Sequence, residues 1–180
     1  MIAVHVKPAG PRDPELLSRI ARGDEEALGE LIRRYRNRFY GVARRMLGDG
    51  GDAEDALQIT FFRVFRHAAA YREEWGGSAW LYRILTNVCI DQWRKRRTVS
   101  AAVESFARLS APAVSGERVD VDRALAKLPP EARAILILCY VEELSYGEIA
   151  RARGISVNTV KTQLLRAKRF MRKHLREEEK

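Results

Sequence analysis

Residues 145 to 175 read SYGEIARARGISVNTVKTQLLRAKRFMRKHL, and this stretch decides the fold of the C-terminal part of the chain. Ser145 and Glu148 have the spacing of a capping box at the start of a helix. Gly154 can end this helix in the left-handed conformation, and Ser156 can cap a second helix that begins at Val157. Two helices joined by such a turn form a helix-turn-helix, which places its second helix in the major groove of DNA. The stretch therefore predicts a DNA-binding domain.

The second helix of this motif has two different faces. At 100° per residue, its apolar side chains fall on one side, which we expect to be buried: Val160, Leu164, Ala167 and Met171. The outward side chains can bond base edges, phosphates or a thymine methyl group, and the candidate contacts are Asn158, Thr159, Lys161, Thr162, Leu165, Arg166 and Arg169. Residues 151 to 176 hold nine Lys or Arg and no Asp or Glu. Solvated faces usually mix both signs, so the pattern favours nucleic acid over a solvated packing helix.

The composition of the whole chain agrees with this prediction. Its 180 residues include 33 Lys and Arg against 24 Asp and Glu, and the formal charge of +9 favours a polyanionic partner. Apolar residues recur with helical spacing and no stretch alternates strictly, which predicts an all-α protein. No run approaches the roughly 18 apolar residues of a membrane span. We therefore expect no membrane insertion and a cytoplasmic location.

Three helices are predicted in the N-terminal half. The first follows Asp24 as N-cap and ends at Gly48, with an apolar face made of Leu28, Leu31, Ile32, Tyr35, Phe39, Val42 and Met46. The second runs from Asp52 to about His67, and its inward stripe is Leu57, Phe61, Val64 and Phe65. The third runs from about Ser78 to Arg97.

Residues 98 to 119 have a different composition. They are rich in Ala, Ser and Val, contain one proline and one glycine, and their charges cancel, which is typical of a linker. This predicts an N-terminal tail (residues 1–14), a first domain (15–97), the linker (98–119) and a second domain (120–180). The fold class is thus two small all-α domains on a flexible linker, the C-terminal one a helix-turn-helix. Fully stretched, the linker would reach roughly 75 Å.

Two segments of the first domain have side chains that suggest a binding role. On the second helix, large apolar Ile59 and Phe62 point away from the inward stripe, which indicates either a docking site or contact with another helix. Between residues 71 and 87, aromatic side chains flank Gly76 and Gly77, with Arg83 and Asn87 just behind. Such aromatics can stack unpaired bases or can form the core of a small domain, and the residues alone leave both open.

Other kinds of site find little support. Cys89 and Cys139 lie among apolar neighbours and the three histidines are scattered, so we predict core cysteines and neither a metal site nor a cofactor. An acidic cluster of Asp49, Asp52, Glu54 and Asp55 is the best candidate for an enzyme site. Its spacing does not fit a calcium loop, and a helix start favours carboxylates without any catalysis. We therefore expect no enzyme activity.

Three ordered motifs resemble those of the extracytoplasmic-function (ECF) sigma factors of bacterial RNA polymerase. They are residues 52–55 (DAED) with Gln58, residues 80–84 (WLYRI) with Asn87 and Asp91, and residues 145–150 (SYGEIA) through Val160 and Lys161. The resemblance extends from about Glu15 to Leu175. It implies a factor that binds core RNA polymerase and directs promoter-specific initiation, as an alternative, signal-responsive factor with an anti-sigma protein as partner.

The resemblance also implies roles for particular residues. Asp55 and Gln58 would bind the core enzyme. Together with the outward Ile59 and Phe62 on the same helix, they form the candidate core-binding site. Contacts to the melted −10 element would come from Tyr71, Trp75, Ser78, Arg83 and Asn87. The recognition helix would read the −35 element of promoter DNA.

The chain departs from the family pattern at two places. Ile59 stands where the family often has Glu, and the pair Gly76 and Gly77 replaces a serine followed by an aromatic residue. The alternative function is a stand-alone helix-turn-helix regulator that binds duplex DNA without polymerase. Such a regulator would shift a palindromic duplex on its own, whereas a sigma factor initiates only with core enzyme.

Overall fold

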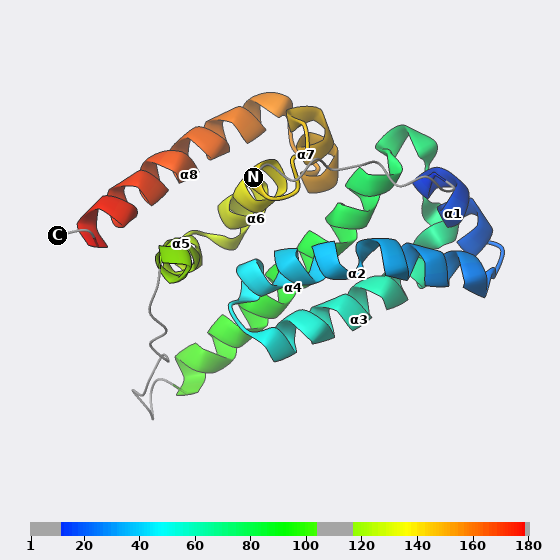
Figure 1. Ribbon diagram of the computed structural model, residues 1–180, viewed down its shortest axis with the longest axis horizontal. Coiled ribbons are helices and arrows are strands. Elements are labelled where there is room, and N and C mark those ends of the chain that lie inside the picture. Colours follow the sequence, from blue (N-terminus) through cyan, green and yellow to red (C-terminus); the bar gives the residue numbers. More distant parts are fainter. Residues whose placement is uncertain (1–11, 104–116, 179–180) are drawn as a thin grey trace.

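The computed structural model describes residues 12–103 and 117–178, and all regular structure in these ranges is helical, as predicted (Figure 1). The helices and two short 3-10 turns, in chain order, are α1 (Asp13–Ile20), α2 (Glu25–Leu47), α3 (Gly50–His67), η1 (Ala68–Ala70), η2 (Glu73–Trp75), α4 (Gly77–Val103), α5 (Glu117–Ala126), α6 (Pro130–Tyr140), α7 (Tyr146–Arg153) and α8 (Val157–Glu178).

The first half of the molecule is a bundle in which α2, α3 and α4 pack against one another (Figure 1). Asp24 caps α2 as predicted, because its side chain accepts a hydrogen bond from the Ala27 N–H at 3.0 Å. Gly48 ends α2 in the left-handed conformation, with φ of 80°. This stop allows α3 to fold back along α2.

Aromatic rings fill the centre of this bundle. Phe39 is fully buried, and its ring centroid lies 4.9 Å from that of Tyr35, 5.2 Å from Tyr82 and 5.7 Å from Phe61. These rings come from α2, α3 and α4, so one cluster holds the three helices together. Burial raises the pKa of the Tyr35 and Tyr82 hydroxyls well above their ordinary value.

Helix α1 was not predicted. Pro14 and two acidic residues occupy its first turn, and Leu16, Leu17 and Ile20 are buried against the bundle. Asp13 fixes its start, because this carboxylate accepts hydrogen bonds from Arg34 Nη1 at 2.9 Å and from the Tyr35 hydroxyl at 2.5 Å. The segment from residue 13 to 20 therefore belongs to the first bundle.

Two details of the sequence prediction were wrong. Phe65 does not join the inward stripe of α3, since 43% of its surface is exposed. The buried positions are Ala53, Ala56, Leu57, Thr60 and Val64, which place Phe65 about 100° beyond the last of them. The third helix also continues past Arg97 to Val103, in keeping with the helix-forming alanines at 101 and 102. Most of the remaining predicted linker, residues 104–116, lies outside the described residues.

The second half consists of α5 to α8. Pro130 occupies the first turn of α6, where its missing N–H costs nothing, and Ile135 and Leu136 are buried. Helices α6, α7 and α8 pack against one another, and α5 packs against α8. Cys89 is fully buried, Cys139 is half-buried, and both are free thiols. Burial raises the pKa of Cys89 to about 12.

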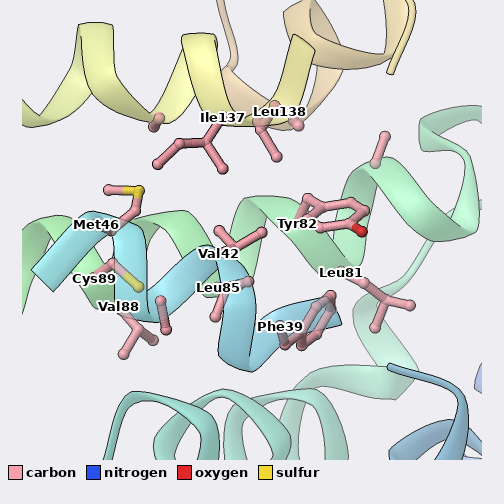
Figure 2. Close-up of a cluster of buried hydrophobic side chains, with 14 of the residues drawn as sticks. Phe39, Val42, Met46, Leu81, Tyr82, Leu85, Val88, Cys89, Ile137 and Leu138 are labelled. Carbon is pink, nitrogen blue, oxygen red and sulfur yellow. The ribbon is translucent and has the colours of Figure 1, made fainter. Parts of the chain in front are cut away.

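The two halves also pack against each other. Helices α5 and α6 contact α2, and both α6 and α7 contact α4 (Figure 1). Figure 2 shows Ile137 and Leu138 of α6 pointing toward Met46 and Val42 of α2 and Tyr82 of α4. The buried apolar residues consequently form one continuous cluster across both halves. Within the part of the chain that the structure describes, none of the helices is long and apolar enough to cross a lipid bilayer.

Candidate nucleic-acid interface

The helix-turn-helix has the local geometry that its sequence predicts. The Ser145 N–H donates to Glu148 Oε2 at 2.9 Å and the Glu148 N–H donates to Ser145 Oγ at 3.3 Å, so the capping box at α7 is complete. Gly154 adopts φ of 66°, and the Thr159 N–H donates to Ser156 Oγ at 3.1 Å. Three residues separate α7 from α8. The motif is therefore set by short-range hydrogen bonds.

Helix α8 has the two faces expected for a recognition helix. Val160, Leu164 and Ala167 are buried against α6 and α7, and Met171 is half-buried. Six of the seven candidate DNA contacts are exposed: Asn158, Lys161, Thr162, Leu165, Arg166 and Arg169. The seventh, Thr159, is half-buried and its hydroxyl bonds that of Ser156 at 2.8 Å. The outward face thus carries amide, hydroxyl and cationic groups, the types that contact bases and phosphates.

A second candidate surface is a hollow of about 430 Å³ beside the start of α4. We call it the α4 hollow, and its lining is Arg63, His67, Ala70, Trp75, Trp80, Arg83, Ile84 and Asn87. It combines the part-exposed Trp75 indole with two guanidinium groups and an amide, which suits an unstacked base and its phosphates, whereas Trp80 is only 6% exposed at its edge. The structure thus brings three predicted residues to one place: Trp75, Arg83 and Asn87.

The two other residues predicted for this surface lie apart from the hollow. Tyr71 is half-buried, and its ring packs edge-on against Trp80 with centroids 5.5 Å apart. Burial is also the main reason that its pKa is raised. Ser78 is half-buried in the first turn of α4. Tyr71 therefore supports Trp80, which does line the hollow.

The structure explains why glycine occupies both position 76 and position 77. Gly76 has φ of 73°, a conformation that side chains other than glycine rarely adopt. A Cβ added to Gly77 would lie 2.5 Å from the Asp13 Cβ, much closer than two such atoms approach. The glycine pair therefore lets α1 sit directly against the start of α4.

The α4 hollow is in contact with the second half of the molecule. Arg153 of α7 donates from Nη1 to Asn87 Oδ1 at 3.0 Å and to Thr86 Oγ1 at 2.9 Å. Burial lowers the pKa of Arg153, although its guanidinium remains a cation at neutral pH. Arg151 of the same helix lies beside Gly76. Sequence reasoning missed these contacts, because the partners are more than 60 residues apart.

The outward face of α3 is exposed, which favours a docking site over the alternative of contact with another helix of the described structure. Asp55 and Gln58 are exposed, Ile59 is 38% exposed and Phe62 is 64% exposed. We call these four residues the α3 stripe, and exposed Phe65 extends its apolar part. In the described structure neither Ile59 nor Phe62 belongs to the core cluster. Large apolar side chains on an open helix face are typical of a docking surface.

Two members of the acidic cluster, Asp49 and Asp52, have structural roles. Asp49 caps α3 by accepting from the Asp52 N–H at 3.0 Å, and this hydrogen bond is the main reason that its pKa is lowered. Asp52 forms an ion pair with Arg96 of α4. Among the described residues no group of acidic, histidine or cysteine side chains is arranged to hold a metal ion.

Comparisons with known proteins match both halves of the chain. The family model for Sigma-70 region 2 matches residues 31–99, and the model for Sigma-70 region 4 matches residues 118–171. The ECF RNA polymerase sigma factor SigW of Bacillus subtilis is 30% identical over 89% of this chain and 95% of its own length. SigM of Mycobacterium tuberculosis is 32% identical over 87% of this chain and 81% of its own length.

One relative is considerably longer. SigE of Mycolicibacterium smegmatis is 36% identical over 86% of this chain, which spans 65% of that relative. Among solved structures, CnrH in complex with the cytosolic domain of CnrY superposes with a TM-score of 0.72 at 25% identity, over 92% of this chain and 97% of that one. The sigma factor RpoE in complex with the anti-sigma factor NepR from Bartonella quintana superposes with a TM-score of 0.67 at 25% identity. The match covers 82% of this chain and 96% of that one.

Proposed function

This chain belongs to the ECF sigma factors, which direct RNA polymerase in transcription initiation and are not enzymes, and we propose how it divides that work between its surfaces. The α3 stripe binds core RNA polymerase. The α4 hollow takes a base of the melted −10 element, and the outward face of α8 reads the −35 element as duplex. The first domain then spans residues 15–97 and the second residues 120–180.

One observation carries this proposal: two basic surfaces of different chemistry lie on the same chain as an exposed apolar stripe. The α4 hollow offers the part-exposed Trp75 indole, and an indole stacks on unpaired bases whatever their identity. Helix α8 offers Asn158 and Arg166, which bond base edges inside an intact groove. A duplex-binding regulator needs only the second surface. A factor that recognises one promoter element as duplex and melts another needs both.

The proposal includes partners and a location. Its partners are core polymerase and promoter DNA. Because both are in the cytoplasm, we propose a cytoplasmic location for this chain. RpoE of Bartonella quintana has been solved with an anti-sigma factor, and CnrH with the cytosolic domain of CnrY. We propose that a protein of the anti-sigma kind holds this chain inactive until a signal releases it, so that it serves as an alternative factor.

Run-off transcription with purified core polymerase tests the function. We expect transcripts from a matching promoter only when both core enzyme and this chain are present. A stand-alone regulator would instead shift a palindromic duplex without polymerase and would support no initiation. Failure to copurify with core enzyme, or to initiate with it, would refute the proposed function.

Ile59→Asp tests the α3 stripe. A hot-spot side chain at an interface contributes about 2 kcal/mol or more, and if Ile59 is one, a buried carboxylate in its place should weaken binding to core enzyme by about thirtyfold. Binding of α8 to duplex DNA should not change. The matched control is Asn37→Asp, which places the same carboxylate on an exposed position of α2. Loss of helix content in Ile59→Asp alone would mean that Ile59 is a core residue.

A further inference from the structure

The Trp75 ring of the α4 hollow lies on a short connection between α3 and α4. Residues 73–75 form η2, a single 3-10 turn, and such a turn is not rigid by itself because its hydrogen bonds have poor geometry. Its contacts on the solvent side are weak. The Arg72 guanidinium lies 5.9 Å from the centroid of the Trp75 ring, and its ion pair with Glu74 spans 3.9 Å between exposed side chains. The position of Trp75 therefore depends on what this connection packs against.

Helix α1 supplies that packing. It contacts both η1 and α4, which flank the connection. The closest approach is at Gly77, which is buried and follows Trp75 by two residues. A Cβ added to Gly77 would lie 2.5 Å from the Asp13 Cβ and 3.2 Å from the Pro14 Cδ. The first turn of α1 thus lies directly against the residues that join Trp75 to α4.

The side chain of Asp13 fastens this turn to α2. Its carboxylate accepts hydrogen bonds from Arg34 Nη1 at 2.9 Å and from the Tyr35 hydroxyl at 2.5 Å. The Arg34 side chain is 11% exposed and that of Asp13 is 19% exposed, so water and salt weaken this pair less than a surface pair. The Tyr35 ring belongs to the aromatic cluster of the core, 4.9 Å from the centroid of Phe39. Asp13 therefore connects the centre of the bundle to the start of α4.

We propose that Asp13 is a positioning residue for single-strand recognition, which holds the Trp75 ring at the α4 hollow through the contact between α1 and Gly77. The proposal rests on the assignment of the α4 hollow to the −10 element. Asp13 acts through Trp75, since it does not itself line the hollow. Without this support the ring leaves its place in a fraction of the molecules, and the apparent affinity falls in proportion to the molecules that remain competent.

Asp13→Ala tests the proposal by removing both hydrogen bonds to α2. If the ring then keeps its place in about a tenth of the molecules, binding of a fluorescein-labelled single-stranded non-template oligonucleotide to the polymerase holoenzyme weakens about tenfold. Asp24→Ala is the matched control, because it also removes a carboxylate that joins α1 to α2, at the other end of α1. Circular dichroism establishes that each variant is folded. An unchanged affinity in Asp13→Ala, or an equal loss in the control, would overturn the proposal.

A double-mutant cycle with Trp75→Ala separates positioning from a general structural role. Asp13→Ala should cause no further loss of affinity once the Trp75 ring is absent, because it acts through that ring. Asp13→Asn keeps an oxygen acceptor for Tyr35 and should retain most of the affinity. Losses that add in the double variant would contradict the positioning role.

The same cycle distinguishes two kinds of failure. If Trp75→Ala alone leaves the affinity unchanged, the assignment of the α4 hollow to single-stranded DNA is wrong, and the positioning role falls with it. A loss in Trp75→Ala without any loss in Asp13→Ala would refute the positioning role and leave the proposed function intact.

Gly77→Ala tests the same contact while the Asp13 carboxylate stays in place. The added methyl group has no room against α1, whereas the nearest atom to a Cβ added in the control, Gly147→Ala, lies 3.8 Å away. The free chain labelled with 5-fluorotryptophan reports each indole by fluorine NMR. We expect the Trp75 resonance to shift or broaden in both Asp13→Ala and Gly77→Ala, and that of Trp93 to stay unchanged. A Trp75 resonance identical to that of the wild type in both variants would overturn the proposal.

Discussion

The outward face of α8 and the α4 hollow are both basic, but they are built in different ways. Residues within one contiguous helix form the first surface, and six of its seven candidate side chains are exposed. The second surface needs α3, α4 and the turns between them, and it touches α7 of the other half. The comparison teaches that a surface made by one helix is specified locally, whereas an assembled surface depends on packing of the whole bundle.

The largest effect is expected from the core that supports the assembled surface. Phe39→Ala should lower the free energy of unfolding by about 3–5 kcal/mol, because Phe39 is fully buried among three other rings. Urea denaturation of the full chain measures this loss. Phe62→Ala is the control, since it removes a ring that is 64% exposed and should change stability by about 0.5 kcal/mol or less. Similar losses in both variants would show that Phe39 is not central to the bundle.

Stacking in the α4 hollow should give the next effect. Trp75→Ala should weaken binding of the polymerase holoenzyme to a single-stranded non-template oligonucleotide by about 1–3 kcal/mol. Fluorescence anisotropy measures the affinity. Trp93→Ala serves as control, because that half-buried indole lies further along α4 and packs against Arg97. An unchanged affinity in Trp75→Ala would remove this side chain from the single-strand surface.

On the outward face of α8, Arg166→Ala should weaken binding to −35 duplex by about 1–3 kcal/mol and reduce the salt dependence of that binding. The matched control is Lys168→Ala, since the Lys168 ammonium lies over the Tyr140 ring, 4.9 Å from its centroid, on the side of α8 that faces α6. We expect a smaller loss for the control in the same gel-shift titration. Equal losses would show that the assigned facing of α8 is wrong.

The smallest effect concerns the cap that begins the motif. Ser145→Ala removes both hydrogen bonds of the side chain at the start of α7 and should cost about 1 kcal/mol of stability. Ser145→Asn keeps an oxygen acceptor at the N-cap and should restore most of it. Amide hydrogen exchange in α7 measures the change. A loss equal in both variants would mean that the cap itself does not stabilise α7.

The sequence predicted features that depend on nearby residues and missed those that depend on distant ones. The caps of α2 and α7, the stop at Gly154 and the two faces of α8 were predictable, because each depends on residues within about two helical turns. The outward position of Ile59 and Phe62 on α3 was predictable for the same reason, but whether another helix covers them was not. Phe65 was assigned to the wrong face because it is large and apolar, although it lies at least 80° from every buried position of α3.

Contacts between distant residues were beyond sequence reasoning. Nothing local to Arg153 indicates that it meets Asn87, and nothing near Arg133 indicates that it bonds the Met46 carbonyl. One signal was available for α1, since Pro14 and acidic residues in a first turn precede an apolar group. The role of Gly77 depends on that unpredicted helix, so its close approach to Asp13 could not be inferred.

The contact between the two halves has a consequence for synthesis on the ribosome. Arg38 Nε of α2 donates to Glu142 Oε2, in the loop after α6, at 2.9 Å, and the two residues are 104 positions apart. Translation proceeds at about 5–20 residues per second, so Glu142 is added roughly 5–20 s after Arg38. Once α4 has been added the first bundle can form, and its surface around Val42, Met46 and Tyr82 stays uncovered until α6 and Glu142 follow. A partner that recognises the undocked first half can therefore bind it before Glu142 has been added.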